Sequence, residues 1–278
     1  VYGIRRGYVG LITGDIIPMD EKSVTDIIHN GGTILYTARC PEFRTAEGVA
    51  KAKAKCDELG IEGLVVIGGD GSFRGAADLS ALGMLTVGIP GTIDNDIACT
   101  EYTIGYDTAM NTAMELVDKL RDTSQSHDRI SVVEVMGRGA GHIAVNTGVA
   151  CGATDIITKE IPYSLDKIAN TMLEKKSRGK QNFVVIVAES IGNSQQIAEI
   201  LQEKTGIESR ATVLGHVQRG GSPTVRDRVE ATRMGHYAVE LLEQGKGNRV
   251  VGIKEGKIVD YDIQEALAMT KPYDVELH

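Results

Sequence analysis

LVVIGGDGS at residues 64–72 and LTVGIPGTIDND at residues 85–96 decide the fold of this chain. Each stretch is a short apolar run that leads directly into a glycine-rich turn, which is typical of a buried parallel strand followed by a loop. In α/β sheets, ligands bind in the crevice at the carboxyl ends of such strands. The two runs would therefore deliver the carboxylates of Asp70, Asp94 and Asp96 to one edge of a sheet, which suits Mg²⁺-assisted phosphoryl transfer.

The composition is ordinary for a globular protein. Of the 278 residues, 42% are hydrophobic and 24% are charged. The formal net charge of −8 argues against nucleic acid as the main partner, but it leaves room for small anionic substrates beside local arginine clusters. No apolar run approaches the ~18 residues of a membrane span, and so no membrane partner is expected. The four cysteines predict reduced, mostly buried thiols in a cytoplasmic protein, with a metal site as a remote alternative.

Strand and helix signals alternate along the chain, which predicts mostly parallel sheets built from βαβ units. We expect strands near residues 1–4, 33–36, 64–67, 85–90, 129–136, 183–188, 211–214, 250–253 and 257–260. We expect helices near residues 21–29, 46–59, 72–82, 106–121, 139–150, 165–176, 194–204 and 226–243. Roughly nine or ten strands are too many for one comfortable open sheet. Two lobes with a cleft between them are therefore predicted.

The turn GGDGS at residues 68–72 has the composition of a phosphate cradle. Glycines let backbone N–H groups approach a polyphosphate, and the N-terminus of the following helix adds a favourable partial charge. Asp70 can hold Mg²⁺ directly or through water. An ordinary tight turn between strand and helix, with Asp as a cap, is the alternative interpretation.

Asp94 and Asp96 stand two residues apart in the loop after the second apolar run. In an extended loop such side chains point the same way, so that one can accept a hydroxyl proton while the other helps to seat a metal. Asp and Asn also form turns by bonding their own backbone, and a purely structural Asx turn is the alternative. A further acidic cluster at a predicted strand end favours the functional interpretation.

A third turn, MGRGAGH at residues 136–142, follows another apolar run. It lacks the dinucleotide-binding fingerprint, and its Arg138 would instead face a developing phosphoryl charge. A helix-entry turn with a solvated arginine is the alternative. Other basic residues at predicted strand ends or loops can bind phosphate, although each could equally be a solvated surface charge: Arg39, Arg44, Arg129, Arg210, His216 and Arg219.

In order and spacing, these strings, together with LGHVQRGG at residues 214–221, resemble the ATP-dependent 6-phosphofructokinases of the short bacterial type over the whole chain. The resemblance implies two Rossmann-like three-layer α/β lobes with the active site in the cleft between them. Residues 1–105 plus 218–268 would form the ATP-binding lobe, and residues 106–217 plus 269–278 would form the sugar-phosphate-binding lobe. The implied reaction is phosphoryl transfer from MgATP to the 1-hydroxyl of fructose 6-phosphate, a cytoplasmic step of glycolysis.

The resemblance also implies roles for individual residues. Asp94 would be the base for the sugar hydroxyl, Thr92 and Arg138 would contact the transferring phosphoryl group, and Asp70 and Asp96 would organise Mg²⁺. The positions that match the ATP site are Tyr8, Arg39, Cys40, Arg44, Gly69, Asp70, Gly71, Ser72 and Gly75. Those that match the fructose 6-phosphate site are Thr92, Ile93, Asp94, Met136, Gly137, Arg138, Glu189, His216, Val217, Gln218 and Arg219. Arg129 and Arg210 match arginines that a neighbouring subunit lends to that site, which implies a homotetramer.

A second set of positions matches the site at which relatives bind the effectors ADP or phosphoenolpyruvate. This set comprises Arg121, Gly152, Ala153, Thr154, Arg178, Lys180, Gln181 and Asn182. Thr154 stands where a metal-binding Glu is usual, and Gln181-Asn182 replaces a Lys-His pair. Because these changes remove charge, we expect weakened binding of anionic effectors and blunted allosteric control.

The resemblance implies that the choice of phosphoryl donor, ATP or diphosphate, depends on two glycines. Diphosphate-using relatives carry Asp and Lys at the positions of Gly71 and Gly91, and glycine at both leaves room for ATP. A diphosphate-dependent enzyme and a non-catalytic nucleotide-sensing homologue are the alternatives, although a sensing subunit would be expected to have lost Asp94 or Arg138. Lipid and NAD kinases share the Gly-Gly-Asp-Gly turn but lack the strings at residues 92–96 and 214–221.

The resemblance further implies a strand and a Gly-rich loop upstream of Val1. We therefore expect the sequence to be a fragment. Without that central strand its neighbours would be left partly unpaired, and so we expect poor stability and weak activity from this exact span.

Overall fold

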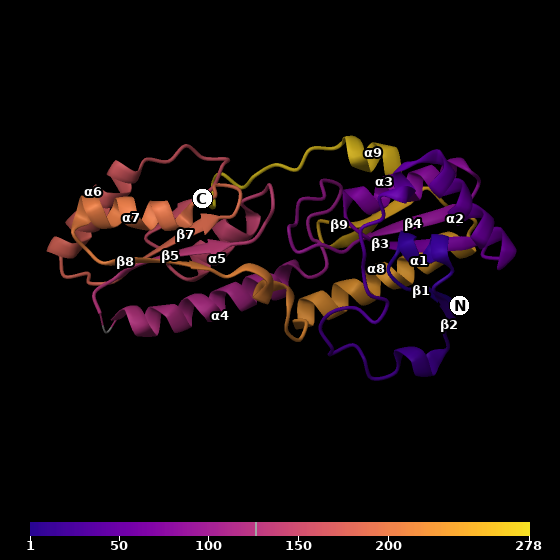
Figure 1. Cartoon of the computed structure of the whole chain (residues 1–278), viewed down its shortest axis with the longest axis horizontal. Coiled ribbons are helices and arrows are strands. Elements are labelled where there is room, and N and C mark those ends of the chain that lie inside the picture. The colour runs from indigo at the N-terminus through magenta and orange to yellow at the C-terminus, as the bar shows by residue number, and fades with distance from the viewer. Residues whose placement is uncertain (126) are drawn as a thin grey trace. The chain divides into compact units, whose positions relative to one another are not determined.

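Runs of aliphatic and β-branched residues form the central strands of two separate sheets. The computed structural model describes residues 1–125 and 127–278, and its contacts divide the chain into two units. Unit 1 comprises Val1–Thr92, Ile97–Gly105 and Gly221–Lys271, and unit 2 comprises Ile93–Asp96, Tyr106–Gly220 and Pro272–His278. Each unit is an α/β structure with its own sheet and core (Figure 1).

Unit 1 contains a four-stranded sheet in the order β10-β9-β4-β3. Strands β3, β4 and β9 are parallel, and β10 pairs antiparallel with β9. The strands of this unit are β1 (Tyr2–Ile4), β2 (Ile16–Pro18), β3 (Gly63–Gly68), β4 (Leu85–Pro90), β9 (Arg249–Lys254) and β10 (Lys257–Asp262). Its helices are α1 (Tyr8–Thr13), η1 (Glu21–Val24), η2 (Glu42–Arg44), α2 (Ala46–Glu58), α3 (Asp70–Ala81), α8 (Val225–Glu243) and α9 (Ile263–Ala268).

The core of unit 1 lies mainly between its sheet and helices α2, α3 and α9. Phe73 of α3 packs with Val250 of β9 and Ile263 of α9, and all three are buried. A Cβ at Gly88 of β4 would lie 2.7 Å from the Phe73 ring, so glycine lets helix and sheet approach closely there. Helix α8 covers the opposite face of the sheet (Figure 1), where Leu242 lies against Gly63.

Unit 2 contains a second four-stranded sheet, in the order β6-β7-β5-β8, and all of its strand pairs are parallel. Its strands are β5 (Ile130–Val135), β6 (Asp155–Ile157), β7 (Phe183–Ala188) and β8 (Ser209–Val213). Its helices are α4 (Tyr106–Gln125), α5 (His142–Ala150), α6 (Leu165–Ser177), α7 (Ser194–Thr205) and η3 (Gly215–Arg219). Strand β7 reads FVVIVA and is buried along its whole length, as expected for a central parallel strand covered on both faces.

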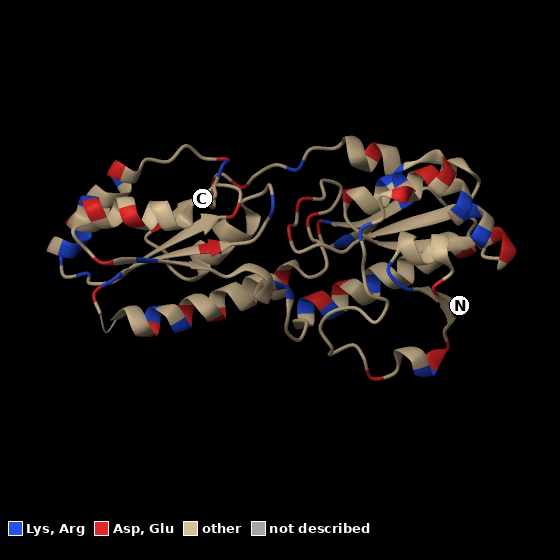
Figure 2. Ribbon diagram, in the orientation of Figure 1, with Lys and Arg blue, Asp and Glu red and all other residues tan. Residues whose placement is uncertain are grey.

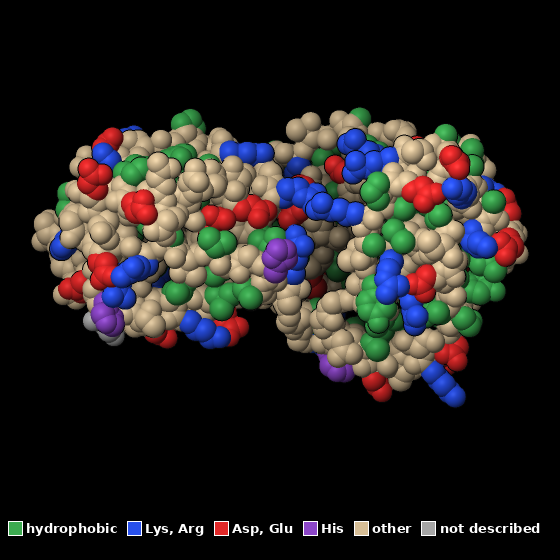
Figure 3. Space-filling view, viewed as in Figure 1, with side chains coloured by type: hydrophobic (Ala, Val, Ile, Leu, Met, Phe, Trp, Pro, Cys, Tyr) green, Lys and Arg blue, Asp and Glu red, His purple; other side chains and the backbone are tan. Residues whose placement is uncertain are grey.

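Alternate residues of these strands face two helical layers. Val185 and Val187 of β7 join a core with Met172 of α6 and Leu201 of α7, while α5 packs on the other face, where Ile156 and Ile186 meet Gly148. Helix α4 lies on the α5 side and carries both acidic and basic side chains (Figure 2). On the face drawn in Figure 3, charges of both signs are interspersed over each unit, so the net charge of −8 is not gathered into a single field there.

Two of the predicted elements are wrong. The predicted strand at residues 33–36 is a turn, in which the Thr33 hydroxyl accepts a hydrogen bond from the N–H of Leu35 at 3.2 Å, since such side chains compete with strand pairing. The predicted helix at residues 21–29 is only the short 3₁₀ helix η1, capped by Asp20. It ends at Thr25, which is extended, and it cannot resume at Asp26, whose φ of 57° a right-handed helix does not accommodate.

Several elements begin elsewhere than predicted or were missed. Helix α3 begins at Asp70 rather than at residue 72, since Gly69 is its N-cap. Helix α1 and the short strands β2 and β6 were not predicted. All four cysteines carry free thiols, and three of them are buried. No helix in the described part of the chain is both long and apolar enough to cross a membrane.

Candidate functional site

Strands β3 and β4 end at the same edge of the sheet of unit 1. Gly68 pairs with Pro90 in parallel register, and the N–H of Gly91 donates to the carbonyl of Gly68 at 2.9 Å. The GGDGS turn and the loop that begins at Gly91 therefore leave the sheet side by side. This confirms that the two strands are neighbours whose loops leave the same edge. Asp70 belongs to unit 1 whereas Asp94 and Asp96 belong to unit 2, so the gathering of the three carboxylates stays a prediction.

The GGDGS turn leads directly into the first turn of α3. Gly69 is extended and caps the helix, and its carbonyl accepts from the N–H of Ser72 at 2.8 Å and of Phe73 at 3.1 Å. Asp70 and Gly71 thus occupy the positive end of a twelve-residue helix. A Cβ built on Gly71 has no heavy atom within 4 Å. The fold therefore does not itself require glycine at this position.

The predicted ATP-binding residues Tyr8 and Gly75 form one packed group in unit 1. The Tyr8 ring stacks on Phe43 with centroids 3.8 Å apart, and its hydroxyl donates to the carbonyl of Ser72 at 2.6 Å. Burial, together with the nearby Asp78, raises the pKa of Tyr8 above its usual value. A Cβ at Gly75 would lie 2.7 Å from the Tyr8 ring, so this glycine has a packing role. Close to Phe43 in the sequence, Cys40 is half-buried, and Arg39 and Arg44 are exposed.

In unit 2, the structure brings Asp94 and Arg138 together from distant parts of the sequence. Arg138 Nε lies 3.5 Å from Asp94 Oδ2. The Asp94 residue is only 4% exposed, whereas the Arg138 side chain is 76% exposed. Asn95, next to Asp94, has a φ of 50°, a left-handed conformation that Asn tolerates. The pair therefore combines a sheltered proton acceptor with a guanidinium group that remains open to an anion.

The turn that carries Arg138 is held by side chains from two other segments. The N–H of Met136 donates to Gln218 Oε1 at 2.8 Å. Glu189 Oε1 accepts from the N–H of Gly137 at 3.2 Å and also from that of Arg138. Gln218 is 1% exposed, so it holds the turn from within the protein. The resemblance assigned Glu189 and Gln218 to substrate, and this backbone-holding role was not predicted.

The turn is also strained, since Gly137 has a φ of 146° and Arg138 a φ of 52°. A Cβ at Gly137 would lie 2.6 Å from the carbonyl oxygen of Ala140. We predict that Gly137→Ala lowers the free energy of unfolding by about 1–3 kcal/mol and lowers kcat by misplacing Arg138. Thermal denaturation and initial rates measure the two effects. Gly139→Ala is the matched control, because its Cβ meets only the flexible end of Lys159, at 3.4 Å; equal behaviour of the two variants would contradict the prediction.

The remaining predicted sugar-phosphate residues follow β8. His216, Val217 and Arg219 lie on the short helix η3 and are exposed, whereas Gln218 between them is buried. Helix η3 contacts α4 of the same unit. The LGHVQRGG string thus presents three side chains outward and turns one inward toward Met136.

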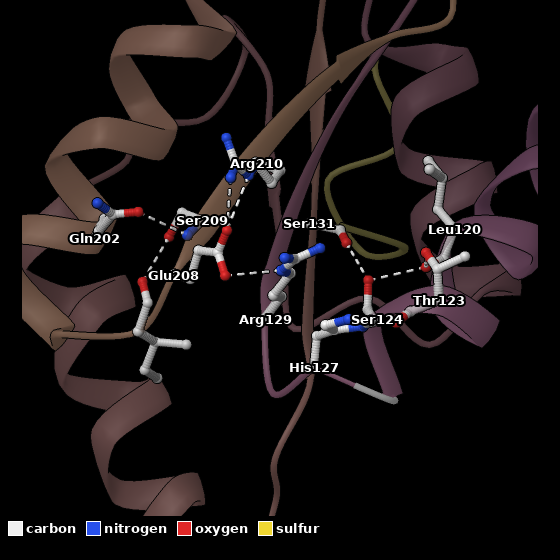
Figure 4. Close-up of polar contacts among 11 residues, drawn as sticks. Leu120, Thr123, Ser124, His127, Arg129, Ser131, Gln202, Glu208, Ser209 and Arg210 are labelled. Atoms are coloured by element: carbon white, nitrogen blue, oxygen red, sulfur yellow. Dashed lines mark hydrogen bonds and ion pairs between the residues drawn. The ribbon is translucent and has the colours of Figure 1, made fainter.

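Arg129 and Arg210 lie at the other end of the sheet of unit 2. Arg129 precedes β5, and Arg138 follows it. A six-residue strand spans about 20 Å, so Arg129 cannot reach a small ligand bound beside Arg138 in the same copy of the chain. Arg210 lies at the start of β8, opposite Ser131, and so it cannot reach that ligand in the same copy either. Figure 4 shows both arginines around Glu208.

The predicted effector residues are only partly brought together. Arg121 donates to the carbonyl of Cys151, next to Gly152. Burial, with Lys175 and Arg121 nearby, lowers the pKa of Lys180, which indicates a cluster of cations that includes the unpredicted Lys175. The other predicted members sit in ordinary local contacts. Arg178 pairs with Glu174 on α6, Ala153 and Thr154 donate backbone N–H groups to the carbonyls of Gly148 and Val184, and Gln181 and Asn182 form the entry to β7.

The carboxylates predicted to organise a metal come from different units, Asp70 from unit 1 and Asp96 from unit 2. Within residues 1–125 and 127–278, no group of three or more His, Cys, Asp or Glu side chains is placed to hold a metal ion. Mg²⁺ usually takes one or two carboxylates and completes its shell with water and substrate phosphates. Asp70 and Asp96 are each a ligand of the type that Mg²⁺ prefers.

Comparisons with known proteins agree with these features. Residues 1–242 match the family model described as Phosphofructokinase. The chain is 58% identical over 278 residues to an ATP-dependent 6-phosphofructokinase of Clostridium botulinum, covering 100% of this chain and 87% of the relative. It is 56% identical, with the same coverage, to an ATP-dependent 6-phosphofructokinase of Clostridium tetani.

Solved structures give the same result for the fold. The phosphofructokinase of Saccharomyces cerevisiae superposes with a TM-score of 0.91 at 32% identity, over 96% of this chain and 41% of that chain. The chain therefore spans less than half the length of the yeast polypeptide. A pyrophosphate-dependent phosphofructokinase from Marinobacter aquaeolei superposes with a TM-score of 0.86 over 99% of this chain and 77% of that one, but at 21% identity this likeness concerns the fold alone.

Proposed function

The chain belongs to the phosphofructokinase family, and from this membership we propose that it transfers the terminal phosphoryl group of ATP to the 1-hydroxyl of fructose 6-phosphate. The products are ADP and fructose 1,6-bisphosphate. The observation that carries the proposal is the pair formed by buried Asp94 and exposed Arg138, 3.5 Å apart. This pair places a proton acceptor and a cation at one point, as phosphoryl transfer to an alcohol requires.

Asp94 is the proposed base for the sugar hydroxyl. An ordinary carboxylate is a weak base for an alkoxide, but it suffices when the transition state is loose and the proton leaves late. Arg138 then faces the charge that develops on the transferring phosphoryl group, and Thr92 contacts the same group. Most of the rate enhancement comes from alignment and electrostatic stabilisation, which is why the turn held by Glu189 and Gln218 matters.

The proposed nucleotide site lies at the carboxyl ends of β3 and β4. Residues 69–72 at the start of α3 provide a helix N-terminus for the phosphates. Tyr8, Arg39, Cys40, Arg44 and Gly75 line the proposed remainder of this site. Asp70 and Asp96 would hold Mg²⁺, which when bound neutralises phosphate charge.

The distance along β5 supports a shared active site. Because Arg129 and Arg210 lie at the opposite end of the sheet from Arg138, we propose that they serve the sugar-phosphate site of a neighbouring copy in a homotetramer. His216 and Arg219, together with Met136 and Gly137, would complete that site from within each copy. The cation cluster of Arg121, Lys175 and Lys180 is the proposed remnant of an effector site for ADP or phosphoenolpyruvate.

The diphosphate-dependent alternative is not favoured. Its solved representatives are 21% identical, whereas ATP-dependent relatives are 58% identical over the full chain. Glycine stands at both positions 71 and 91, which leaves room for the nucleotide. A non-catalytic sensing subunit would have no need of the Asp94–Arg138 pair.

The proposal is tested by a coupled assay that detects fructose 1,6-bisphosphate. The assay uses the natural protein to which this sequence belongs. With Mg²⁺ and fructose 6-phosphate, the protein should turn over with ATP and show little activity with diphosphate. Faster turnover with diphosphate, or none with either donor, would contradict the proposal.

A further inference from the structure

Glu208 stands between the two arginines at the start of the sheet of unit 2. Its Oε2 accepts from Arg129 Nε at 2.9 Å. Its Oε1 accepts from Arg210 Nε at 3.1 Å and from Arg210 Nη2 at 2.7 Å. Figure 4 shows the carboxylate with one guanidinium on each side. Each carboxylate oxygen is therefore dedicated to one arginine.

The backbone around Glu208 is fixed by the sheet. Its carbonyl accepts from the N–H of Ile130 at 2.9 Å, which locks the chain next to Arg129. The following Ser209 donates its N–H to Gln202 Oε1 of α7 at 3.0 Å. Arg129 and Glu208 thus directly precede the paired strands β5 and β8, and Arg210 lies on β8, so the sheet holds the backbone that carries all three charges.

The charges of this cluster do not cancel. Hydrogen bonds from Arg129 and then from Arg210 lower the pKa of Glu208, so the carboxylate is ionised at neutral pH. Two guanidinium groups and one carboxylate leave a net charge of about +1. Without the carboxylate, two neighbouring cations would repel each other and separate. Glu208 therefore keeps them close.

Glu208 uses only one side of each guanidinium group. Arg129 Nη1 and Nη2 and Arg210 Nη1 donate to no residue within the described ranges 1–125 and 127–278. The side chain of Arg210 is 70% exposed, and that of Glu208 is 40% exposed. Outward N–H groups on two adjacent guanidinium planes are the donors that a phosphate accepts best.

We propose that Glu208 is a positioning residue that holds Arg129 and Arg210 as a two-pronged clamp for the phosphate of the sugar substrate. This inference rests on the proposed function, in which both arginines bind that phosphate in a neighbouring copy. Glu208 itself does not touch the substrate. It orders two long side chains before the substrate arrives, which lowers the entropic cost of binding.

The opposite role for Glu208 makes the opposite prediction. A carboxylate that merely occupies the arginines would compete with phosphate, and its removal would tighten binding. A carboxylate that orders the arginines would, when removed, weaken binding. The sign of the change in KM for fructose 6-phosphate therefore decides between the two roles.

The test compares Glu208→Gln with Glu203→Gln in the natural protein. Glu203 is an exposed residue of α7, and its replacement is the matched control. Glutamine keeps the shape of Glu208 but turns an amide N–H₂ toward one guanidinium. We expect KM for fructose 6-phosphate to rise about tenfold, the equivalent of one charged hydrogen bond. Saturating kcat and KM for ATP should stay within about twofold, and Glu203→Gln should match the parent.

Further variants keep the test decisive. Glu208→Asp retains the charge and should fall between the parent and Glu208→Gln. In a chain that already carries Arg129→Ala and Arg210→Ala, Glu208→Gln should add nothing, a result that a general structural role would not give. Thermal denaturation checks that each variant folds.

The outcomes separate this inference from the proposed function. A KM that is unchanged or lower in Glu208→Gln, while Arg210→Ala raises it, would overturn the clamp alone. If Arg210→Ala leaves KM unchanged, or the parent does not use fructose 6-phosphate, the proposed function fails and the clamp fails with it.

Discussion

Replacement of Asp94 by Asn should lower kcat about a thousandfold, because a general base typically contributes 10²–10⁴-fold to the rate. Asparagine keeps the size of the side chain but cannot accept the proton of the sugar hydroxyl. KM for ATP should change little, since Asp94 is not among the residues proposed to bind the nucleotide. Initial rates with varied ATP and varied fructose 6-phosphate measure both quantities.

The loss of the Asp94 charge also leaves Arg138 without its carboxylate partner at 3.5 Å. Thermal denaturation separates this structural effect from the chemical one. Asp122→Asn, on the exposed surface of α4, is the matched control and should behave as the parent. A kcat for Asp94→Asn within a few-fold of the parent would remove Asp94 from the role of base.

Gly71→Asp should raise KM for ATP about a hundredfold while leaving the fold intact. No heavy atom lies within 4 Å of a Cβ at this position, and an acidic side chain in the first turn of α3 is compatible with the helix dipole. The free-energy cost appears only when the nucleotide binds, because a negative side chain beside a phosphate costs several kcal/mol. A hundredfold rise in KM corresponds to ~2.7 kcal/mol.

The control for this prediction is Gly71→Ala, which adds the Cβ without the charge and should keep KM for ATP near that of the parent. Thermal denaturation should show equal stability for both variants. If Gly71→Asp and Gly71→Ala show the same KM for ATP, charge repulsion at this position does not select the phosphoryl donor.

The parts of the fold that could be predicted are those that local sequence specifies. The run FVVIVA predicts a buried strand, and β7 occupies those residues, Phe183–Ala188. Helix α2 begins at Ala46, as predicted, with Thr45 as its cap. The predictions were wrong where a side chain takes a backbone hydrogen bond that a strand would use, as at Thr33, or where one residue adopts a left-handed conformation, as at Asp26. The three-residue strand β6 carries too short a pattern to be recognised without its partner β7.

The candidate site also has parts that the sequence predicts and parts that it does not. The turns that carry Asp70, Asp94 and Arg138 are local motifs, and their placement at strand ends follows from the βαβ pattern. The residues that support them are distant in sequence. Gln218 reaches Met136 across 82 positions, and Glu208 reaches Arg129 across 79. Such contacts carry no local signal, so only the folded chain identifies the side chains that hold the functional ones in place.

The length of β5 has a consequence for how this enzyme would be handled. Under the proposed function, the arginines at its two ends would serve different substrate molecules, since about 20 Å separates them. On the proposed assembly, one isolated copy holds two half-sites and no complete one. Dilution that dissociates the copies would then abolish activity although every copy stays folded. Specific activity would therefore depend on enzyme concentration.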